Sequence, residues 1–265
     1  MALFQTTQAR FCARSERADR RVPMSEATPE SSFELSKRNR VVRRPARGKY
    51  DKATVYDILD SALVCHIAYV IDGQPYCTPT SFWREGDHLY WHGSSASRML
   101  RNQATGIPVC LTVTHTDAIV LARCGFNHSI NYRSVMAYGK AHVIEDQAEK
   151  VTAMNSFIDR FFLGRSKLIR PATEKEIKAT TFLGMEIEQA SGKIRNEPVH
   201  DDEEDYAVPA WTALFPIRTV VGAAEECPRQ MEGVTRPDDM SSYVAERNLD
   251  EIMLESYRKL YGDEG

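Results

Sequence analysis

The stretch LVCHIAYVIDGQPYCTPTSFWREGDHLYWHG, residues 63–93, decides the fold. It contains three runs rich in β-branched and aromatic residues, which favour β-strands. The runs are separated by Asp72-Gly73 and by Glu85-Gly86-Asp87, and both separators have the chemistry of hairpin turns. The spacing therefore predicts an antiparallel meander with strands over residues 63–70, 74–85 and 88–93.

The segments after the meander extend the sheet. Strand-like composition recurs over residues 109–114, 118–124, 134–145 and 182–195. A short helix capped by Thr54 is expected over residues 55–62, another over residues 94–106, and a longer one after Asp146 with an apolar stripe of Val151, Met154, Ile158 and Phe161 or Phe162. Six or more antiparallel strands with only a few helices predict a mainly β fold, a small closed or split β-barrel with helices.

Charge and composition divide the chain into three parts. Residues 1–50 carry twelve Lys/Arg against five Asp/Glu, so +7, and the remainder carries −10. We expect a disordered basic N-terminal segment over residues 1–45, the barrel domain over residues 46–195, and a C-terminal extension over residues 196–265. In the extension, DDEED at 201–205 is an acidic run, and residues 238–261 are expected to form an amphipathic helix through Leu249, Ile252, Met253, Tyr257 and Leu260.

The bulk properties exclude several classes of protein. No apolar run approaches the eighteen or so residues that span a bilayer, and an acidic body argues against a nucleic-acid-binding core. The six cysteines form no CxxC pair and the seven histidines no zinc-like grouping, so we expect a reduced compartment and no metal. The prediction is a cytoplasmic protein. Five arginines in residues 1–22 leave a mitochondrial presequence as the alternative, and Met24 could equally be the start, so the role of residues 1–23 stays open.

The first chemical motif is WHGSSASRML, residues 91–100, where a strand runs into a helix start. A phosphate needs converging N–H and O–H donors and a cation, and Gly93, the serines and Arg98 supply these groups. A plain helix N-cap is the alternative explanation, because serines are common at helix starts.

The second motif is VLARCGFNHSINYRSVMAYGKA, residues 120–141, which is unusually dense in polar groups before it becomes a strand. We expect the two motifs to be the halves of one site that binds an anion and a ring. His128, Asn131 and Tyr132 could line the ring, or could fix the shape of the loop by hydrogen bonds to their own backbone. Cys124 is expected to be a small buried residue and not a nucleophile.

Together, WHGSSASRMLRNQ and LARCGFNHSINYRSVMAYGKA resemble the FMN-binding split barrels related to pyridoxamine 5'-phosphate oxidase, especially the flavin-nucleotide-binding branch that includes nitroimidazole-resistance proteins. The resemblance covers residues 40–195, with a weaker echo near Trp211. It implies a homodimer with non-covalent FMN at the subunit interface, the ring against strands and the phosphate at the strand-to-helix turn. The cofactor contacts that it implies, by position, are Pro79, Thr80, Ser81, Phe82, Trp91, His92, Gly93, Ser94, Ser97, Arg98, Met99, Arg133 and Ser134.

One position departs from the family. The oxidases place a lysine where this chain has Met99, so one phosphate cation is missing, and Arg133 is a possible substitute because an arginine can grip a phosphate with two N–H groups. Oxidation of pyridoxamine phosphate itself is therefore not expected.

The resemblance implies an FMN-dependent oxidoreductase that passes electrons from NAD(P)H to a small organic acceptor, such as a nitro compound. His92 is the histidine expected near the flavin, where it could donate a proton or a hydrogen bond. Two alternatives remain open: a flavin carrier or sensor without turnover, and a split barrel that uses haem or deazaflavin. No nucleic acid or membrane partner is expected.

Overall fold

The computed structural model describes residues 31–237, 240 and 242–262, and within them the meander is confirmed. The strands β2 (Val64–Ile71), β3 (Gln74–Glu85) and β4 (His88–Ser94) pair antiparallel in succession. At the first turn, Asp72 and Gly73 both have positive φ, 50° and 75°, as a type I′ hairpin turn requires. The expectations for residues 1–30, including the presequence and the start at Met24, lie outside the described residues.

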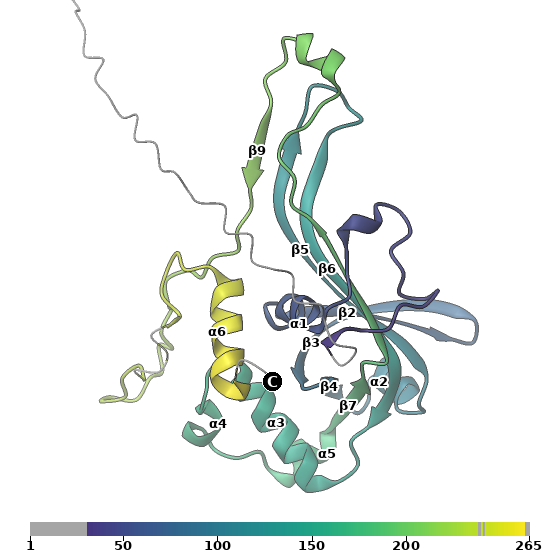
Figure 1. The fold of residues 1–265 in the computed structure, drawn as a ribbon. Helices are drawn as coiled ribbons and strands as arrows, with labels where there is room; N and C mark the ends of the chain where they lie inside the picture. The colour runs from purple at the N-terminus through teal and green to yellow at the C-terminus, as the bar shows by residue number, and fades with distance from the viewer. Residues whose placement is uncertain (1–30, 238–239, 241, 263–265) are drawn as a thin grey trace, which may run out of the picture.

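The sheet closes into a barrel (Figure 1). Its order runs β6 (Ser129–Val143), β7 (Thr180–Glu186), β4, β3, β2 and β5 (Pro108–Leu121), and the antiparallel β5–β6 pair completes the ring. From β6 the sheet also branches into β8 (Gln189–Arg195) and β1 (Gly48–Lys49). The mainly β, split-barrel fold is therefore as predicted. Residues 182–195, predicted as one strand, form β7 and β8 with a break between them.

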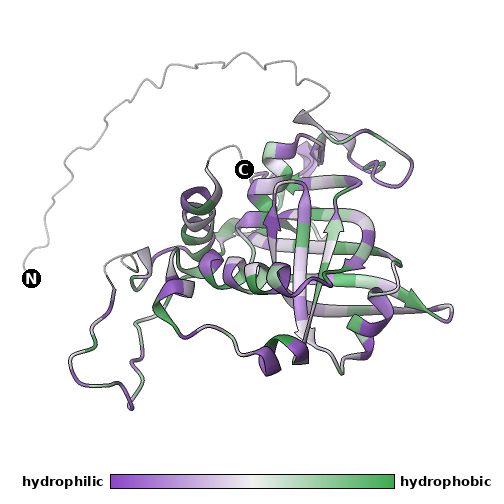
Figure 2. Cartoon of the chain, turned by 90° about the horizontal axis from the view of Figure 1, so that it is seen from below, coloured by the Kyte–Doolittle hydropathy of each residue, from purple (hydrophilic) through white to green (hydrophobic). Residues whose placement is uncertain are grey.

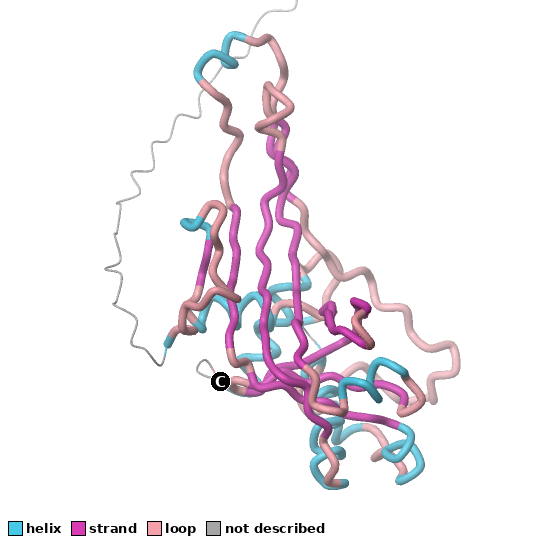
Figure 3. Tube along the Cα trace, turned by 90° about the vertical axis from the view of Figure 1, so that its right-hand side faces the viewer, coloured by secondary structure: helices cyan, strands magenta, loops and turns pink. Residues whose placement is uncertain are grey.

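The strands β5 and β6 are longer than the barrel and project from it as a two-stranded arm (Figures 1 and 3). We define the arm as residues 116–132, with the loop 122–128 at its tip. β9 (Ala213–Pro216) pairs with β5 along the arm. The two strands predicted over residues 109–114 and 118–124 are one strand, because a bulge between Thr116 and Ala118 keeps the pairing with β6 continuous.

Two hydrophobic clusters hold the domain together. The main cluster fills the barrel, and in β2 the side chains alternate between this core and the outside; Figure 2 shows such alternation of hydropathy along the strands. The second cluster joins Trp83 and Phe182 to the helix α3 (Gln147–Phe161) through Ala153 and Phe157. Because both faces of this part of the sheet are covered, Phe82, Trp83 and Arg84 are all buried in succession.

The helices differ from their predictions in detail. α1 (Lys52–Asp60) is capped by Asp51, whose carboxylate accepts from the Thr54 N–H at 2.9 Å, so Thr54 is not the cap. α2 (Arg98–Gln103) begins after the serines instead of with them. α3 is capped by Asp146 as predicted, but Val151 is exposed, and the residues of α3 buried most deeply are Ala153 and Arg160. The short helices α4 (Arg165–Leu168) and α5 (Glu174–Ala179) were not predicted.

Both flanking parts contact the barrel. In the N-terminal segment, predicted to be disordered, Phe33 is 7% exposed and belongs to the core, ahead of the short 3-10 helix η2 (Pro45–Arg47). In the extension, the 3-10 helix η3 (Glu203–Ala207) precedes β9, and α6 (Leu249–Tyr261) buries Ile252, Met253, Ser256 and Tyr257. α6 is thus shorter than the predicted helix 238–261. Within the described residues, no helix has both the length and the apolar character needed to cross a membrane.

Candidate functional site

The strand-to-helix turn from Gly93 to Arg98 offers side-chain donors more than backbone donors. The N–H of Ser95 bonds to the Ala179 carbonyl at 2.9 Å and that of Ser97 to the Ser94 carbonyl at 2.9 Å. The Ala96 N–H bonds to the Ser94 hydroxyl at 3.3 Å. Ser97 is the N-cap of α2, yet its hydroxyl makes no capping bond. The side-chain groups here that can receive a phosphate include the Ser95 and Ser97 hydroxyls and the Arg98 guanidinium.

Arg98 is an exposed cation held close to this turn. Its guanidinium carbon lies 4.6 Å from the ring centroid of Tyr76, and a cation over an aromatic face is attracted by the ring quadrupole. Stacking orients the guanidinium without using its N–H donors, so they stay available for an anion.

Three of the predicted contact residues have side chains inside the barrel. Phe82 is 1% exposed, Trp91 0% and Met99 9%, and all three belong to the main core. The indole N–H of Trp91 donates to the Gln103 side chain at 3.0 Å. These side chains cannot reach a ligand on the outer surface, and a lysine at position 99 would point into the core. The alternation of β4, with Leu89 buried as well, is the sequence signal that could have shown this for Trp91.

The segment Pro79–Ser81 lies beside the turn and offers backbone groups. β3 pairs with β4 only from Phe82 onward, opposite Trp91. Residues 79–81 pair with β2 on their other side, so their edge facing β4 is open. Unpaired backbone N–H and C=O groups at such an edge can bind the donor and acceptor groups of a heterocycle.

His92 points away from the exposed turn and into the second cluster. Its ring stacks on Phe182 at 5.4 Å and meets Phe157 edge-on at 4.4 Å between centroids. Burial lowers the pKa of His92, so the imidazole is neutral at pH 7. Its Nδ1 is buried without a hydrogen-bond partner among the described residues. The side chain is thus a neutral group beneath α3 and not a proton donor at the turn.

Arg133 lies in a different cluster. It forms ion pairs at 2.8 Å with Asp117 of β5 and with Asp250 of α6, and Asp250 also contacts His115 Nδ1 at 3.2 Å. Ser134 donates from its hydroxyl to the Lys193 carbonyl at 3.4 Å. Arg133 therefore anchors the extension to the arm, and within one chain it does not supply the cation that is missing beside Arg98.

The polar residues nearer the tip of the arm mainly hold its shape. Asn131 is 2% exposed, donates to the Glu197 carbonyl at 2.9 Å and accepts from Arg195. His128 is exposed, and its Nδ1 lies 2.8 Å from the Cys124 carbonyl. Of the two roles that the sequence allows for these residues, the structural one therefore applies to Asn131. Within one chain the two sequence motifs do not meet in a single site.

Cys124 is half-buried, and its sulfur lies within 4.8 Å of carboxylate oxygens of Asp201 and Asp205. Asp201 already accepts from the Arg123 N–H at 2.9 Å and from its guanidinium at 3.1 Å. This carboxylate is thereby committed to Arg123, and the group links η3 to the tip of the arm.

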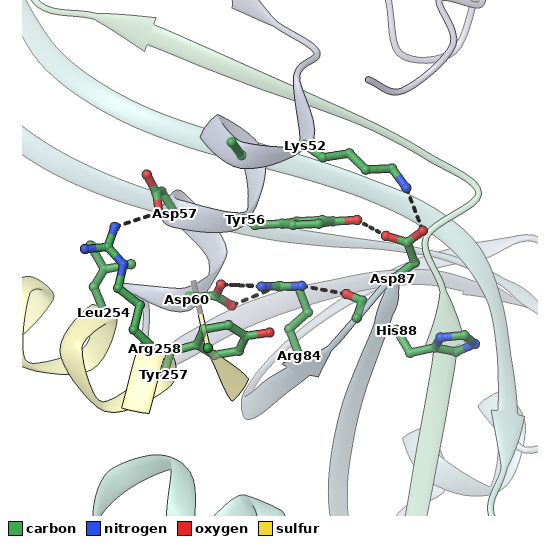
Figure 4. Close-up of a pocket in the computed structure, with 13 residues that line it drawn as sticks. Lys52, Tyr56, Asp57, Asp60, Arg84, Asp87, His88, Leu254, Tyr257 and Arg258 are labelled. Atoms are coloured by element: carbon green, nitrogen blue, oxygen red, sulfur yellow. Dashed lines mark hydrogen bonds and ion pairs between the residues drawn. The ribbon is translucent and has the colours of Figure 1, made fainter. Parts of the chain in front are cut away.

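Sequence reasoning missed a cavity of about 580 Å³ between α1, the β3–β4 turn and α6 (Figure 4). Arg84 lines this cavity, although the residue is only 1% exposed. Its guanidinium carbon lies 3.8 Å from the ring centroid of Tyr56 and 4.5 Å from that of Tyr257. Asp60 binds it at 2.7 Å. Burial raises the pKa of both tyrosines, so the phenols stay neutral. The signal in the sequence was a charged residue inside the apolar run FWRE.

Comparison with known proteins places this geometry in context. The family model described as pyridoxamine 5'-phosphate oxidase matches residues 51–194. The structure of the flavocytochrome Anf3 from Azotobacter vinelandii is 41% identical, covers 79% of this chain and 98% of its own, and superposes with a TM-score of 0.74. The FAD and haem binding protein from Mycobacterium smegmatis is 33% identical, covers 77% and 98%, and gives 0.71. No curated protein matches the chain.

The likeness to these two structures includes the extension. Residues 1–194 are 194 of 265 residues, or 73% of the chain, so a match that covers 79% or 77% must continue beyond residue 194. The family model alone spans more than half of the chain and corresponds to the barrel. The chain therefore belongs to the pyridoxamine 5'-phosphate oxidase family.

Proposed function

We propose that this protein binds a flavin and a haem and acts as an oxidoreductase that passes electrons between them. The observation that carries the proposal is the likeness beyond residue 194 to a flavocytochrome and to an FAD and haem binding protein. The sequence left haem open as an alternative to flavin; we propose instead that the protein binds both cofactors.

The turn and the open edge of β3 fit a flavin. The Ser95 and Ser97 hydroxyls and Arg98 would hold its phosphate, and backbone groups of residues 79–81 would orient its ring. Arg98 is the only cation in the turn 93–98. The FMN phosphate and the FAD diphosphate both carry about two negative charges at pH 7, so this single cation does not distinguish them. The likeness to an FAD and haem binding protein supports the larger cofactor, and we therefore propose FAD in place of FMN.

When bound, the flavin would accept a hydride and the haem single electrons. The chain contributes binding and orientation: Arg98 would hold the anionic end, and the open edge of β3 would fix the ring. We propose a reduced nicotinamide as the donor, with a small organic acceptor served by the same site.

We propose a homodimer. The turn is open to solvent, and the arm of the same chain projects away from the barrel (Figure 3). Along the arm and β9, Ile119, Ile130, Trp211 and Phe215 are 43%, 49%, 73% and 46% exposed, an apolar set that isolated soluble chains rarely leave uncovered. A second copy would cover this set and close the flavin site between subunits.

The visible spectrum of the purified full-length protein tests the proposal. We expect a Soret band together with the two flavin bands, FAD in the extract of the denatured protein, and bleaching of the flavin bands by NADH or NADPH. A protein that binds neither cofactor refutes the proposal. A bound flavin that no nicotinamide reduces would instead support a carrier or sensor.

A further inference from the structure

The structure assigns one axial ligand of this haem to His128, at the tip of the arm. The inference rests on the proposed haem function and names the residue that would bind the iron. Imidazole nitrogen is a common axial ligand of haem iron, and all seven histidines of the chain lie in described residues. Their surroundings separate them.

Two histidines are enclosed or fully engaged, and a third, His142, is exposed but has the Nε2 edge of its ring against a neighbouring strand. His115 uses both ring nitrogens, Nδ1 toward Asp250 and Nε2 toward the Ile58 carbonyl and the Ser61 hydroxyl, each at 3.2 Å. His92 is packed between phenylalanine rings that leave no room for a porphyrin. The Nε2 of His142 lies against the backbone of Gly184, where a Cβ would be only 2.6 Å away.

Three others have no fixed ring. His66 and His200 are exposed, and His88 is half-buried and stacked with Tyr90 at 6.2 Å between centroids. Within the described part of the chain, none of the three forms a hydrogen bond that would set which nitrogen carries the proton. If one of these histidines bound iron, its imidazole ring would have to be fixed in one orientation on binding, and this loss of conformational entropy lowers the affinity.

His128 is already set for a metal. Its Nδ1 lies 2.8 Å from the Cys124 carbonyl oxygen, and because a carbonyl can only accept, Nδ1 must carry the proton. In the neutral ring, Nε2 then holds the free lone pair. Histidines that bind metals almost always donate their second N–H to a carbonyl or carboxylate in this way, which fixes the ring and strengthens the ligand.

The tip offers contact to a flat apolar ring as well. Phe126, two residues before His128, is 86% exposed, and Tyr206 of η3 is 49% exposed. Arg123 joins the two segments, since it bonds to Asp201 and lies 4.6 Å from the Tyr206 centroid. One tip covers only one face of a porphyrin. The haem would therefore lie between the tip and a second copy, in line with the proposed dimer.

Haemin titration of the full-length protein tests the assignment, with the optical and electron paramagnetic resonance spectra as readouts. His128→Ala should weaken haem binding by more than about tenfold and change the spectra of the ligated iron, while its flavin content stays at the wild-type level. In His128→Gly, added imidazole should restore the wild-type spectrum. Two control variants should behave as wild type: His200→Ala, which removes an exposed histidine of the extension, and His66→Ala, which removes an exposed histidine of the barrel.

The outcomes separate this inference from the proposed function. If wild type takes up flavin but no haem, the haem half of the proposal and the assignment both fail. If wild type binds haem and His128→Ala binds it with unchanged affinity and spectra, only the assignment fails. If His66→Ala loses the haem spectrum and His128→Ala keeps it, the assignment of His128 is overturned, and the ligand is His66 on β2.

Discussion

Replacement of Asp60 by Asn tests how the extension is anchored to the barrel. Arg84 and Asp60 are 1% and 3% exposed. Three hydrogen bonds join them: Arg84 Nε donates to Oδ1 at 3.0 Å and to Oδ2 at 3.2 Å, and Nη2 donates to Oδ2 at 2.7 Å. The guanidinium is sandwiched between Tyr56 of α1 and Tyr257 of α6. Asp60→Asn keeps the shape of the side chain but removes the negative charge that compensates a desolvated cation.

The expected loss is large because the cation stays buried. Removal of one partner of a buried ion pair costs about 3–5 kcal/mol. For a chain of this size, 1 kcal/mol corresponds to about 2–4 °C in Tm, so Tm should fall by roughly 6–20 °C. Calorimetry and urea unfolding of the full-length protein measure this. The control is Glu176→Gln, since the Glu176–Arg170 pair has side chains 45% and 67% exposed, and solvent-exposed ion pairs contribute little to stability.

A second variant separates charge from packing. Asp60→Leu combined with Arg84→Met removes both charges and should be more stable than Asp60→Asn, because well-packed apolar residues can replace a buried pair at little cost. The reasoning is refuted if Asp60→Asn unfolds within about 1 kcal/mol of wild type, or if the double variant is no more stable than Asp60→Asn.

Three further predictions concern the turn and its surroundings. Arg98→Ala should weaken flavin binding by about 1.5–3 kcal/mol, the value of a charged hydrogen bond. The flavin that stays bound on gel filtration measures this loss. The control is Arg101→Ala, which removes an exposed arginine one turn further along α2 and should keep its flavin. Met99→Lys should not tighten flavin binding, and its urea midpoint should fall because it places a charge in the core. His92 has a pKa lowered by burial, so the unfolded chain takes up its proton first and wild-type stability should fall as the pH drops below about 6.5. His92→Phe should lose this part of the pH dependence, and an unchanged urea-midpoint profile between pH 7.5 and 5.5 would contradict it.

Local chemistry made much of the barrel predictable. Asp72-Gly73 specifies its turn through its own backbone conformation, and Asp146 caps α3 by accepting from the N–H groups of Ala148 and Glu149. The continuity of β5 was not predictable, because the polar run THTD at 114–117 is typical of a turn. In the structure, His115 and Asp117 bond to residues far along the chain, Asp250 and Arg133. Tertiary contacts thus override the local preference.

The candidate site shows the same limit. The turn at Gly93–Arg98 follows from residue types that phosphate binding needs, and a sequence pattern can show it. The Arg84–Asp60 pair joins β3 to α1, and its aromatic walls come from α1 and α6, so no local pattern contains it. The resemblance carried Trp91 and Met99 over as contacts by position, whereas the direction of a side chain depends on the strand's alternation and on what packs beneath it.

Trp211 provides a direct test of the proposed dimer. The other two tryptophans are 0–1% exposed, whereas Trp211 is 73% exposed. Trp211 lies just before β9, the strand that pairs with β5 along the arm. In a monomer, the accessible part of the tryptophan emission therefore comes from Trp211, and acrylamide should quench it. If a second copy covers the arm, quenching should weaken and the emission shift to the blue as the protein concentration rises through the dissociation constant. Trp211→Phe should show neither change while keeping its fold. A Trp211 that remains fully quenchable in a protein that sediments as a dimer would place the subunit interface elsewhere, because an indole buried between subunits cannot meet the quencher.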